Sequence, residues 1–387
     1  MPEDAPAPGA VRVLHLIETL GPGGAEHQLV SLLKAFDPRL VSSTVVTLHP
    51  PHHLESAARA TGAEVMSLGA GSLRDLIPAV WRLRRWLRST GADVLHTRLT
   101  KADLVGRLAS LGMRDIRVIS TIEAPVYAPE VFADSPQTSP WKVQVVRALD
   151  MVLGRLAACT YVACSHSVAE STGRALHLSR GPRVIPNSVD VRSMPAAQGA
   201  ADHVTAADRV ELLAVGRLSP QKGHTYLIDA LPAILRQYPN ARLSIAGDGP
   251  LAAQLRQQAV DRGVPHAVRF LGVRSDVPQL LAASHVCVLP SHWEGLSIVA
   301  IEALAVGVPV VATGIPSMRE VFGEDGPMRY CTPADPVDLA RQVLAVLADA
   351  PGRHVLHETF RARAAACFDV SEGARKYTSL YRENLRA

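Results

Sequence analysis

Short β-branched runs alternate with longer amphipathic segments along this chain of 387 residues, in two separate series. Such alternation is typical of parallel βαβ units, because two parallel strands must be joined by a crossover that is usually a helix. The first series occupies residues 11–187 and the second residues 210–370. The sequence therefore predicts an α/β protein with two doubly wound, Rossmann-like parallel sheets that face each other across a cleft.

The expected strands are short and apolar. In the first series they are Val11–Ile17, Ser43–Leu48, Glu64–Ser67, Val94–His96, Val118–Thr121, Tyr161–Ala163 and Arg183–Ile185. In the second they are Glu211–Val215, Arg242–Ala246, Val268–Leu271, Val286–Leu289 and Val308–Ala312. Residues 188–209 lose the pattern and are the expected linker, and residues 371–387 are expected to form a final helix.

The composition suits buried parallel sheets, since 48% of the residues are hydrophobic and only 4% are aromatic. Lysine and arginine number 40 against 36 acidic residues, a net charge of +4 without a concentrated basic run. This small imbalance argues against a nucleic-acid partner.

The five cysteines suggest free, buried thiols in a reducing compartment, because their number is odd and most have aliphatic neighbours. Residues 1–10 are acidic and rich in Pro and Ala, and they resemble no secretion signal. We therefore expect a disordered tail on a cytoplasmic protein.

The first expected strand is followed by a glycine-rich loop that includes Gly23 and Gly24 and opens a helix. Free N–H groups at a helix start attract phosphate, so this loop is either a phosphate contact or a tight turn. It lacks the third glycine of the dinucleotide-binding fingerprint.

The first strand of the second series ends in a loop, residues 216–223, that begins and ends with glycine. It holds Arg217 and Lys222, two cations that could clamp a diphosphate, and the order of Gly and Lys is wrong for a P-loop. The alternative is a solvated basic turn. Lys222 gains interest because the chain has only five lysines.

Residues 291–297 follow another expected strand and contain Glu294, while Glu302 lies in the apolar helix that comes next. A carboxylate within an apolar helix needs a partner, either a core arginine or a ligand. Two acids beside a helix start suit polyol hydroxyls, and the same helix start offers N–H groups to phosphate. Residues 247–250, Gly-Asp-Gly-Pro, indicate a turn first and a ligand contact second.

Five segments, in this order along the chain, resemble the motifs of retaining family 4 glycosyltransferases with the GT-B fold. They are Gly23-Gly-Ala-Glu26, Val184–Asp190, Gly216-Arg217 with Lys222-Gly223, Ala246–Pro250, and Glu294 with Glu302, which matches the family's E-x7-E pattern. The resemblance covers nearly the whole chain.

The resemblance implies transfer of a hexosyl or N-acetylhexosaminyl group from a nucleoside-diphosphate sugar, by family habit UDP-linked, to a glycan, lipid-linked or small-molecule acceptor. Arg217 and Lys222 would hold the diphosphate and Glu294 the sugar hydroxyls, and these three are the implied catalytic residues. The other implied donor-binding residues are Gly23, Gly24, Gly216, Val273, Arg274, Gly295, Leu296, Ser297 and Glu302, the last of these on the ribose. No cofactor is implied beyond the donor itself, and the sequence has no Asp-x-Asp pair, so we expect metal-independent chemistry.

The sequence departs from the family at Glu123, where relatives often have histidine. We hypothesise that Glu123 hydrogen-bonds an acceptor hydroxyl or amine. His96 and Lys101, at another strand end, are further acceptor-side candidates, and His96 is equally interpretable as a packed core histidine.

Residues 73–88 form an expected amphipathic helix with arginines and tryptophans on its polar side. Such a helix either touches an anionic membrane or simply covers a sheet, and the second is the simpler interpretation. Two other functions stay open: a sugar-nucleotide epimerase, and a non-catalytic nucleotide-sugar-binding relative.

Overall fold

The computed structural model describes residues 9–50, 53–70, 73–133, 139–197, 205, 209–324 and 328–386. Contacts divide the chain into two compact units, residues 1–188 with 370–387, and residues 189–369. Most of the expected tail (residues 1–8) and part of the expected linker (198–204 and 206–208) lie outside the described residues.

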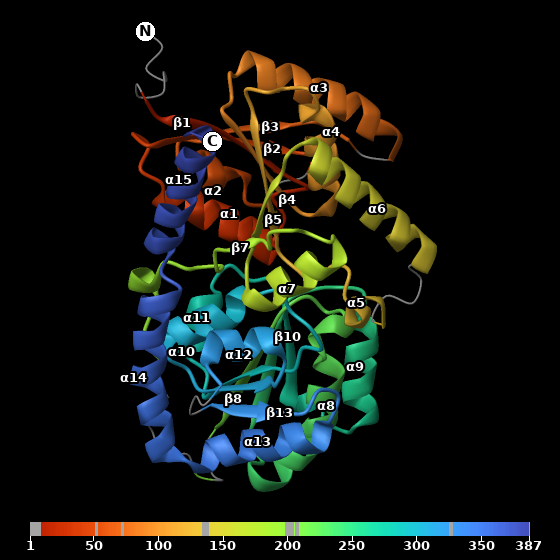
Figure 1. Cartoon of the computed structure of the whole chain (residues 1–387). Helices are drawn as coiled ribbons and strands as arrows, with labels where there is room; N and C mark the ends of the chain where they lie inside the picture. Colours follow the sequence, from red (N-terminus) through yellow and green to blue (C-terminus); the bar gives the residue numbers. More distant parts are fainter. Residues whose placement is uncertain are drawn as a thin grey trace. The chain divides into compact units, whose positions relative to one another are not determined.

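The first unit is built on a seven-stranded parallel sheet with the order β3-β2-β1-β4-β5-β6-β7 (Figure 1). Its strands are β1 (Val11–Ile17), β2 (Val41–Thr47), β3 (Glu64–Ser67), β4 (Val94–Arg98), β5 (Arg117–Ile122), β6 (Thr160–Ala163) and β7 (Arg183–Val184). Its helices are α1 (Gly24–Ala35), α2 (Glu55–Arg59), α3 (Leu76–Ser89), α4 (Thr100–Ser110), α5 (Pro129–Ala133), α6 (Pro140–Leu156), α7 (His166–Ala175) and α15 (Val370–Arg386).

Apolar cores cover both faces of this sheet. On one face α3 and α4 bury their aliphatic side chains against β1 and β4. On the other, α1 and the C-terminal helix α15 pack together over β1, β4 and β5. A parallel sheet buried on both faces needs such continuous aliphatic strands.

The second unit has a six-stranded parallel sheet with the order β10-β9-β8-β11-β12-β13. Its strands are β8 (Glu211–Val215), β9 (Arg242–Ala246), β10 (Val268–Gly272), β11 (Val286–Leu289), β12 (Val310–Thr313) and β13 (Arg329–Cys331). Its helices are α8 (His224–Gln237), α9 (Ala252–Asp261), α10 (Val277–Ala282), α11 (Ile298–Val306), α12 (Pro316–Phe322), α13 (Pro336–Ala348) and α14 (Ala350–Cys367).

The structure confirms both parallel sheets and every expected strand, with strand ends that match or differ by at most two residues. The prediction missed β13, an edge strand of three residues without an apolar run. All five cysteines are free thiols, but the expectation that they are buried is wrong for Cys367, which is exposed.

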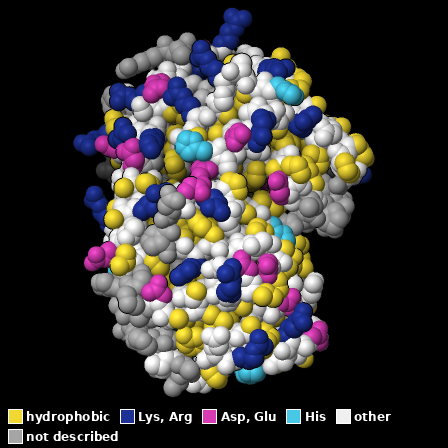
Figure 2. All heavy atoms as spheres, turned by 60° about the horizontal axis from the view of Figure 1, so that its bottom comes forward, with side chains coloured by type: hydrophobic (Ala, Val, Ile, Leu, Met, Phe, Trp, Pro, Cys, Tyr) yellow, Lys and Arg dark blue, Asp and Glu magenta, His cyan; other side chains and the backbone are white. Residues whose placement is uncertain are grey.

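None of the helices in the described ranges combines the length and apolarity needed to span a bilayer. On the face drawn in Figure 2, basic and acidic side chains are interspersed.

In each sheet the strand order reverses next to the first strand, between β1 and β4 in the first unit and between β8 and β11 in the second. Ligands of doubly wound sheets bind beyond the carboxyl ends of the strands at such a switch point. The loops after these four strands are therefore where a site is expected.

Candidate functional site

In the second unit, the loops that follow β8 and β11 are bonded to each other. The side-chain amide of Gln221 donates to the Trp293 carbonyl at 3.1 Å, and the His292 N–H donates to the Gln221 carbonyl at 2.8 Å. The structure thus brings Lys222 and Glu294, 72 residues apart, to one switch point.

Lys222 and Glu294 form an ion pair, with 2.5 Å between Nζ and Oε1. The Ser291 hydroxyl donates to the same Glu294 oxygen at 2.8 Å, and the Thr313 hydroxyl fixes Ser291 by donating to its carbonyl. The Lys222 side chain is 20% exposed and that of Glu294 8%. Ser291, in the loop after β11, and Thr313, at the end of β12, thus hold the pair in place. The Lys222 side chain stays partly exposed to solvent.

Two glycines let the loops approach this closely. A Cβ on Gly223, whose φ is +63°, would lie 2.0 Å from the Pro290 carbonyl oxygen. A Cβ on Gly247, with φ +141°, would lie 2.0 Å from the Gly216 carbonyl oxygen. Only glycine fits at position 247, because its backbone lies against that of Gly216. This supports the turn interpretation of residues 247–250.

Arg217 is exposed and has no ion pair with a described carboxylate, so its guanidinium is available to an anion. Val273 and Arg274 follow β10 at the edge of the sheet, and both are exposed. Arg274 forms an ion pair with Asp276 at 2.6 Å. Of the two cations expected to clamp a diphosphate, Arg217 is therefore free of a described carboxylate, whereas Lys222 is paired with Glu294.

Helix α11 begins directly after this loop, and the Ser297 hydroxyl caps it by accepting from the Ala300 N–H at 3.3 Å. The Ser297 side chain is therefore engaged within the helix. The N-terminal N–H groups of such a helix favour a negative charge.

Glu302 lies in the second turn of α11, and burial raises its pKa to about 7. No described arginine pairs with it, so the core ion pair considered from the sequence is not formed. Its charge in turn raises the pKa of the neighbouring Cys287 thiol, after burial itself. The Glu302 carboxyl, in the helix that follows β11, could therefore accept hydrogen bonds from the hydroxyl groups of a ligand.

Sequence reasoning missed His224, the first residue of α8, directly behind Lys222 and Gly223. Its side chain is buried beside the backbone of Gly216 and Arg217. Burial, together with the Lys222 cation, lowers the pKa of His224 to about 4, so the ring is neutral at pH 7. Its place next to the cationic loop was the only signal that the sequence offered.

In the first unit, the glycine-rich loop packs around its own carboxylate. Glu26 accepts from the Thr19 hydroxyl at 3.2 Å, and a Cβ on Gly23 would lie 2.3 Å from a Glu26 oxygen. Burial, with Glu123 and Glu18 nearby, raises the pKa of Glu26. Gly23 is the N-cap of α1 and Gly24 its first residue, so both interpretations of this loop, tight turn and phosphate contact, fit its geometry.

The acceptor-side candidates gather at the ends of β4 and β5. Glu123 forms an ion pair with Arg98, and the two side chains are 8% and 1% exposed, respectively. The second carboxylate oxygen of Glu123 has no hydrogen-bond partner among the described residues. Lys101, on α4, is 55% exposed and lies 3.7 Å from Glu18. Lys101 is thus exposed at this edge, whereas Glu123 is buried against Arg98 with one oxygen unpaired.

His96 occupies the packed-core position. It is buried, and its two ring nitrogens are 2.7 Å from the Tyr381 and Thr121 hydroxyls. Burial and the Arg98 cation lower its pKa well below the ordinary value. Both nitrogens are therefore used inside the unit.

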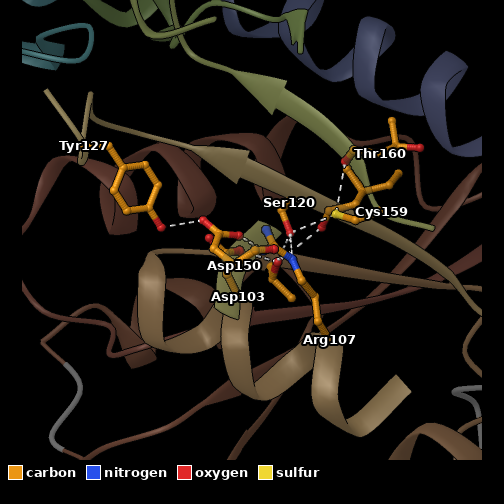
Figure 3. A network of polar contacts seen from close by, with 9 residues as sticks. Asp103, Arg107, Ser120, Tyr127, Asp150, Cys159 and Thr160 are labelled. Carbon is orange, nitrogen blue, oxygen red and sulfur yellow. Dashed lines mark hydrogen bonds and ion pairs between the residues drawn. The ribbon is translucent and has the colours of Figure 1, made fainter. Parts of the chain in front are cut away.

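A second buried network holds the loop after β5 (Figure 3). Arg107 forms an ion pair with Asp150, and Asp150 accepts from the Tyr127 hydroxyl at 2.6 Å. Ser120 lies 3.3 Å from the Arg107 Nε atom, which links β5 to α4. The network fixes the Glu123–Ala128 loop and α6 to the sheet.

Two family models match the chain. The model described as Glycosyltransferase Family 4 matches residues 22–193, and that described as Glycosyl transferases group 1 matches residues 209–349.

The chain is similar to curated relatives from several organisms. It is 29% identical to the phosphatidyl-myo-inositol mannosyltransferase of Mycobacterium leprae, over 92% of this chain and 89% of that protein. It is 40% identical to an uncharacterized glycosyltransferase of Methanocaldococcus jannaschii, and 36% identical to the glycogen synthase of Mycobacterium tuberculosis. These two matches span only 37% and 47% of the relatives' lengths, and 37% and 51% of this chain.

Among solved structures, Anabaena HepE in complex with UDP-glucose has a TM-score of 0.82 at 23% identity, over 96% of this chain and 99% of that one. The sucrose-phosphate synthase of Thermosynechococcus elongatus has a TM-score of 0.77 at 21% identity, over 96% and 98%. At these identities the likeness establishes the fold. With the two parallel sheets, it shows the GT-B fold. The two family models between them match most of the chain, which therefore belongs to the family 4 glycosyltransferases.

Proposed function

We propose that this chain transfers a hexosyl or N-acetylhexosaminyl group from a UDP-linked sugar to a hydroxyl of a glycan, lipid-linked or natural-product acceptor. The observation that carries the proposal is the cluster at the second unit's switch point, where Arg217, Lys222 and Glu294 lie on two interlocked loops. Two cations match the charge of one diphosphate, and a carboxylate suits sugar hydroxyls.

The proposed roles follow from these positions. Lys222 and Arg217 stabilise the charge that develops on the departing diphosphate, helped by the N-terminus of α11. Glu294 orients the sugar by accepting from its hydroxyls, and Glu302 accepts from the ribose. Val273 and Arg274 contact the base, while Gly23 and Gly24 approach the phosphates.

Retention of anomeric configuration and independence from metal are also part of the proposal. Attack on the face from which the diphosphate leaves needs cations at the leaving group more than a protein nucleophile. Arg217 and Lys222 place two cationic groups there, and Glu294 is paired with the second of them. Product anomer analysis by NMR, and assays with and without a chelator, test both points.

On the acceptor side, we propose that the free oxygen of Glu123 hydrogen-bonds the attacking hydroxyl, with Arg98 holding the carboxylate in place. Glu123→Gln should lower kcat/KM for the acceptor and leave donor hydrolysis in water unchanged. An unchanged kcat/KM for the true acceptor would remove Glu123 from the site.

Two further parts of the proposal concern where the enzyme works. The five free thiols favour a reducing compartment, and we place the chain in the cytoplasm. Residues 73–88 are proposed to contact a membrane peripherally, because Ile77 and Trp81 of α3 are 71% and 68% exposed among arginines.

A thermal-shift screen with UDP, GDP and their sugars tests donor binding, because a ligand that binds only the folded state raises the midpoint of unfolding. Labelled donors then report slow hydrolysis. Hydrolysis supports a transferase, whereas interconversion of the bound sugar without release supports an epimerase. UDP binding with every labelled donor left intact would favour the non-catalytic relative.

A further inference from the structure

Helix α6 has a row of exposed apolar residues that sequence patterning did not reveal. The row consists of Trp141, Val145, Leu149, Val152 and Leu156. Their spacing of three or four residues places them on one face of the helix. They are between 47% and 65% exposed, although an amphipathic helix of a globular protein normally turns such a row toward the core.

The opposite face of α6 attaches the helix to the sheet. Its buried residues are Asp150, Leu153 and Gly154, all in its second half. Asp150 pairs with Arg107 in the network of Figure 3, and a Cβ on Gly154 would lie 1.9 Å from the Tyr161 hydroxyl. The exposed row therefore faces outward because buried contacts fix the rotation of the helix.

Cations flank this row. Helix α6 has three, Lys142, Arg147 and Arg155, and its single carboxylate is the buried Asp150. Helix α4 packs against both α6 and α3 in one layer of the first unit (Figure 1), and α3 has no acidic residue. Of its arginines, Arg82, Arg85 and Arg88 are exposed without an ion pair to a described carboxylate.

Helix α3 also has a shallow pocket of about 350 Å³, lined by Trp81, Arg84, Arg85, Arg88 and Ser89. Arg84 is held in place because its Nη1 donates to the Ala109 and Leu111 carbonyls at 2.7 Å. Several guanidinium groups beside an exposed indole form a setting for a phosphate group at the boundary between water and an apolar phase.

We infer that the outer surface of α3 and α6 docks on an anionic lipid bilayer. The α6 row enters the boundary of the acyl chains, and the cations of both helices meet headgroup phosphates. The inference extends the contact proposed for residues 73–88, and it does not depend on the transfer reaction.

Charge selects the bilayer over a second copy of the chain. Two copies that paired their α6 rows would bring Lys142, Arg147 and Arg155 of each helix together, without an exposed carboxylate on α6 to separate them. An anionic surface complements the same cations, and exposed tryptophans are typical of membrane-interface segments.

Cosedimentation of the full chain with vesicles tests the inference. Phosphatidylglycerol-rich vesicles should bind it at low salt and release it at high salt, and pure phosphatidylcholine vesicles should bind it weakly. The variant Val145→Ser/Leu149→Ser/Val152→Ser should lower the partition coefficient at least about tenfold, because inserted apolar area is lost. The variant Arg85→Glu/Arg88→Glu should abolish the salt-sensitive part of the binding to phosphatidylglycerol-rich vesicles.

A matched control is Val260→Ser/Val337→Ser, which removes valines that are 55% and 78% exposed in the second unit. It should bind vesicles like the unchanged chain, and every variant should keep its thermal shift with UDP. That shift separates the two ideas, since its loss in the unchanged chain would count against the proposed donor site alone.

Three results would overturn the inference. They are an absence of binding to anionic vesicles at low salt, equal binding by the α6 variant, and a concentration-dependent dimer in sedimentation velocity that the α6 variant abolishes. The last result would assign the row to self-association.

Discussion

Both sheets reverse their strand order next to their first strand, but the carboxyl edges of their strands differ in how their charged groups are used. At the edge of β4 and β5, Arg98 is buried with Glu123, and His96 has a partner on each ring nitrogen. Next to β8 and β11, Arg217 is exposed and unpaired with any described carboxylate, and no described arginine pairs with Glu302. The first edge uses most of its polar groups for cohesion within the unit, while the second keeps several available for a ligand.

The difference shows that similar topology does not imply a similar site. Both edges carry cations and carboxylates at the carboxyl ends of parallel strands, yet the C-terminal helix α15 covers the first with Tyr377 and Tyr381. Most buried polar groups of a folded protein are hydrogen-bonded, and at this edge the partners of His96 and Thr121 come from α15. We expect substitutions of Arg98 and Tyr381 in the first edge to change stability, and substitution of Arg217 in the second to change catalysis.

The largest effect is expected for Arg98→Met. Removing one partner of a buried ion pair leaves Glu123 charged and unpaired, which should lower the free energy of unfolding by about 3–5 kcal/mol. Urea unfolding measures the loss, and the UDP thermal shift should persist. The double variant Arg98→Met/Glu123→Leu should recover much of the loss, and a single variant as stable as the unchanged chain would contradict a structural role for this pair.

Next in size is the loss from Arg217→Ala. If Arg217 stabilises the leaving diphosphate, kcat/KM should fall by about 10²–10³-fold, as for other groups aimed at developing charge. Stability should be unchanged because Arg217 has no described ion-pair partner. Arg269→Ala, another exposed arginine of the same unit, should be kinetically silent. Equal kinetics for the two variants would remove Arg217 from the site.

Glu302→Gln should show a pH-dependent effect. Folding raises the pKa of Glu302 from an ordinary 4.5 to about 7, so the folded state holds its proton more tightly than the unfolded state. Stability from this group is complete below pH 4.5 and is lost as the pH rises through 7.

The glutamine has no such loss, so at pH 8 the variant should exceed the unchanged chain in unfolding free energy by about 1–3 kcal/mol, and at pH 4 by little. Urea unfolding at the two pH values checks this. Its affinity for UDP should nevertheless be lower if Glu302 accepts from the ribose. Equal gains at both pH values would show that the pKa is not raised.

The smallest effect is expected for Tyr381→Phe, which removes the hydroxyl that lies 2.7 Å from His96. One hydrogen bond contributes about 1 kcal/mol, so unfolding should shift by that amount without any change in UDP binding. A change in donor kinetics would show that the two edges are not separable in function.

The sequence by itself determined the strand order along the chain and the loops that could bind a ligand. Aliphatic periodicity and glycines are local signals, and they sufficed for both sheets and for the loops that hold Lys222 and Glu294. It did not predict β13, because an edge strand of three residues has no periodicity.

Tertiary structure alone decided which polar groups stay available. Tyr381 reaches His96 from 285 residues away, and the exposed row of α6 depends on Asp150 meeting Arg107 from 43 residues away. Whether a charged side chain is buried and paired within the core or stays available for a ligand depends on which distant helix packs against it. That pairing is a property of the folded chain, since contacts of this range appear only when separate βαβ units come together.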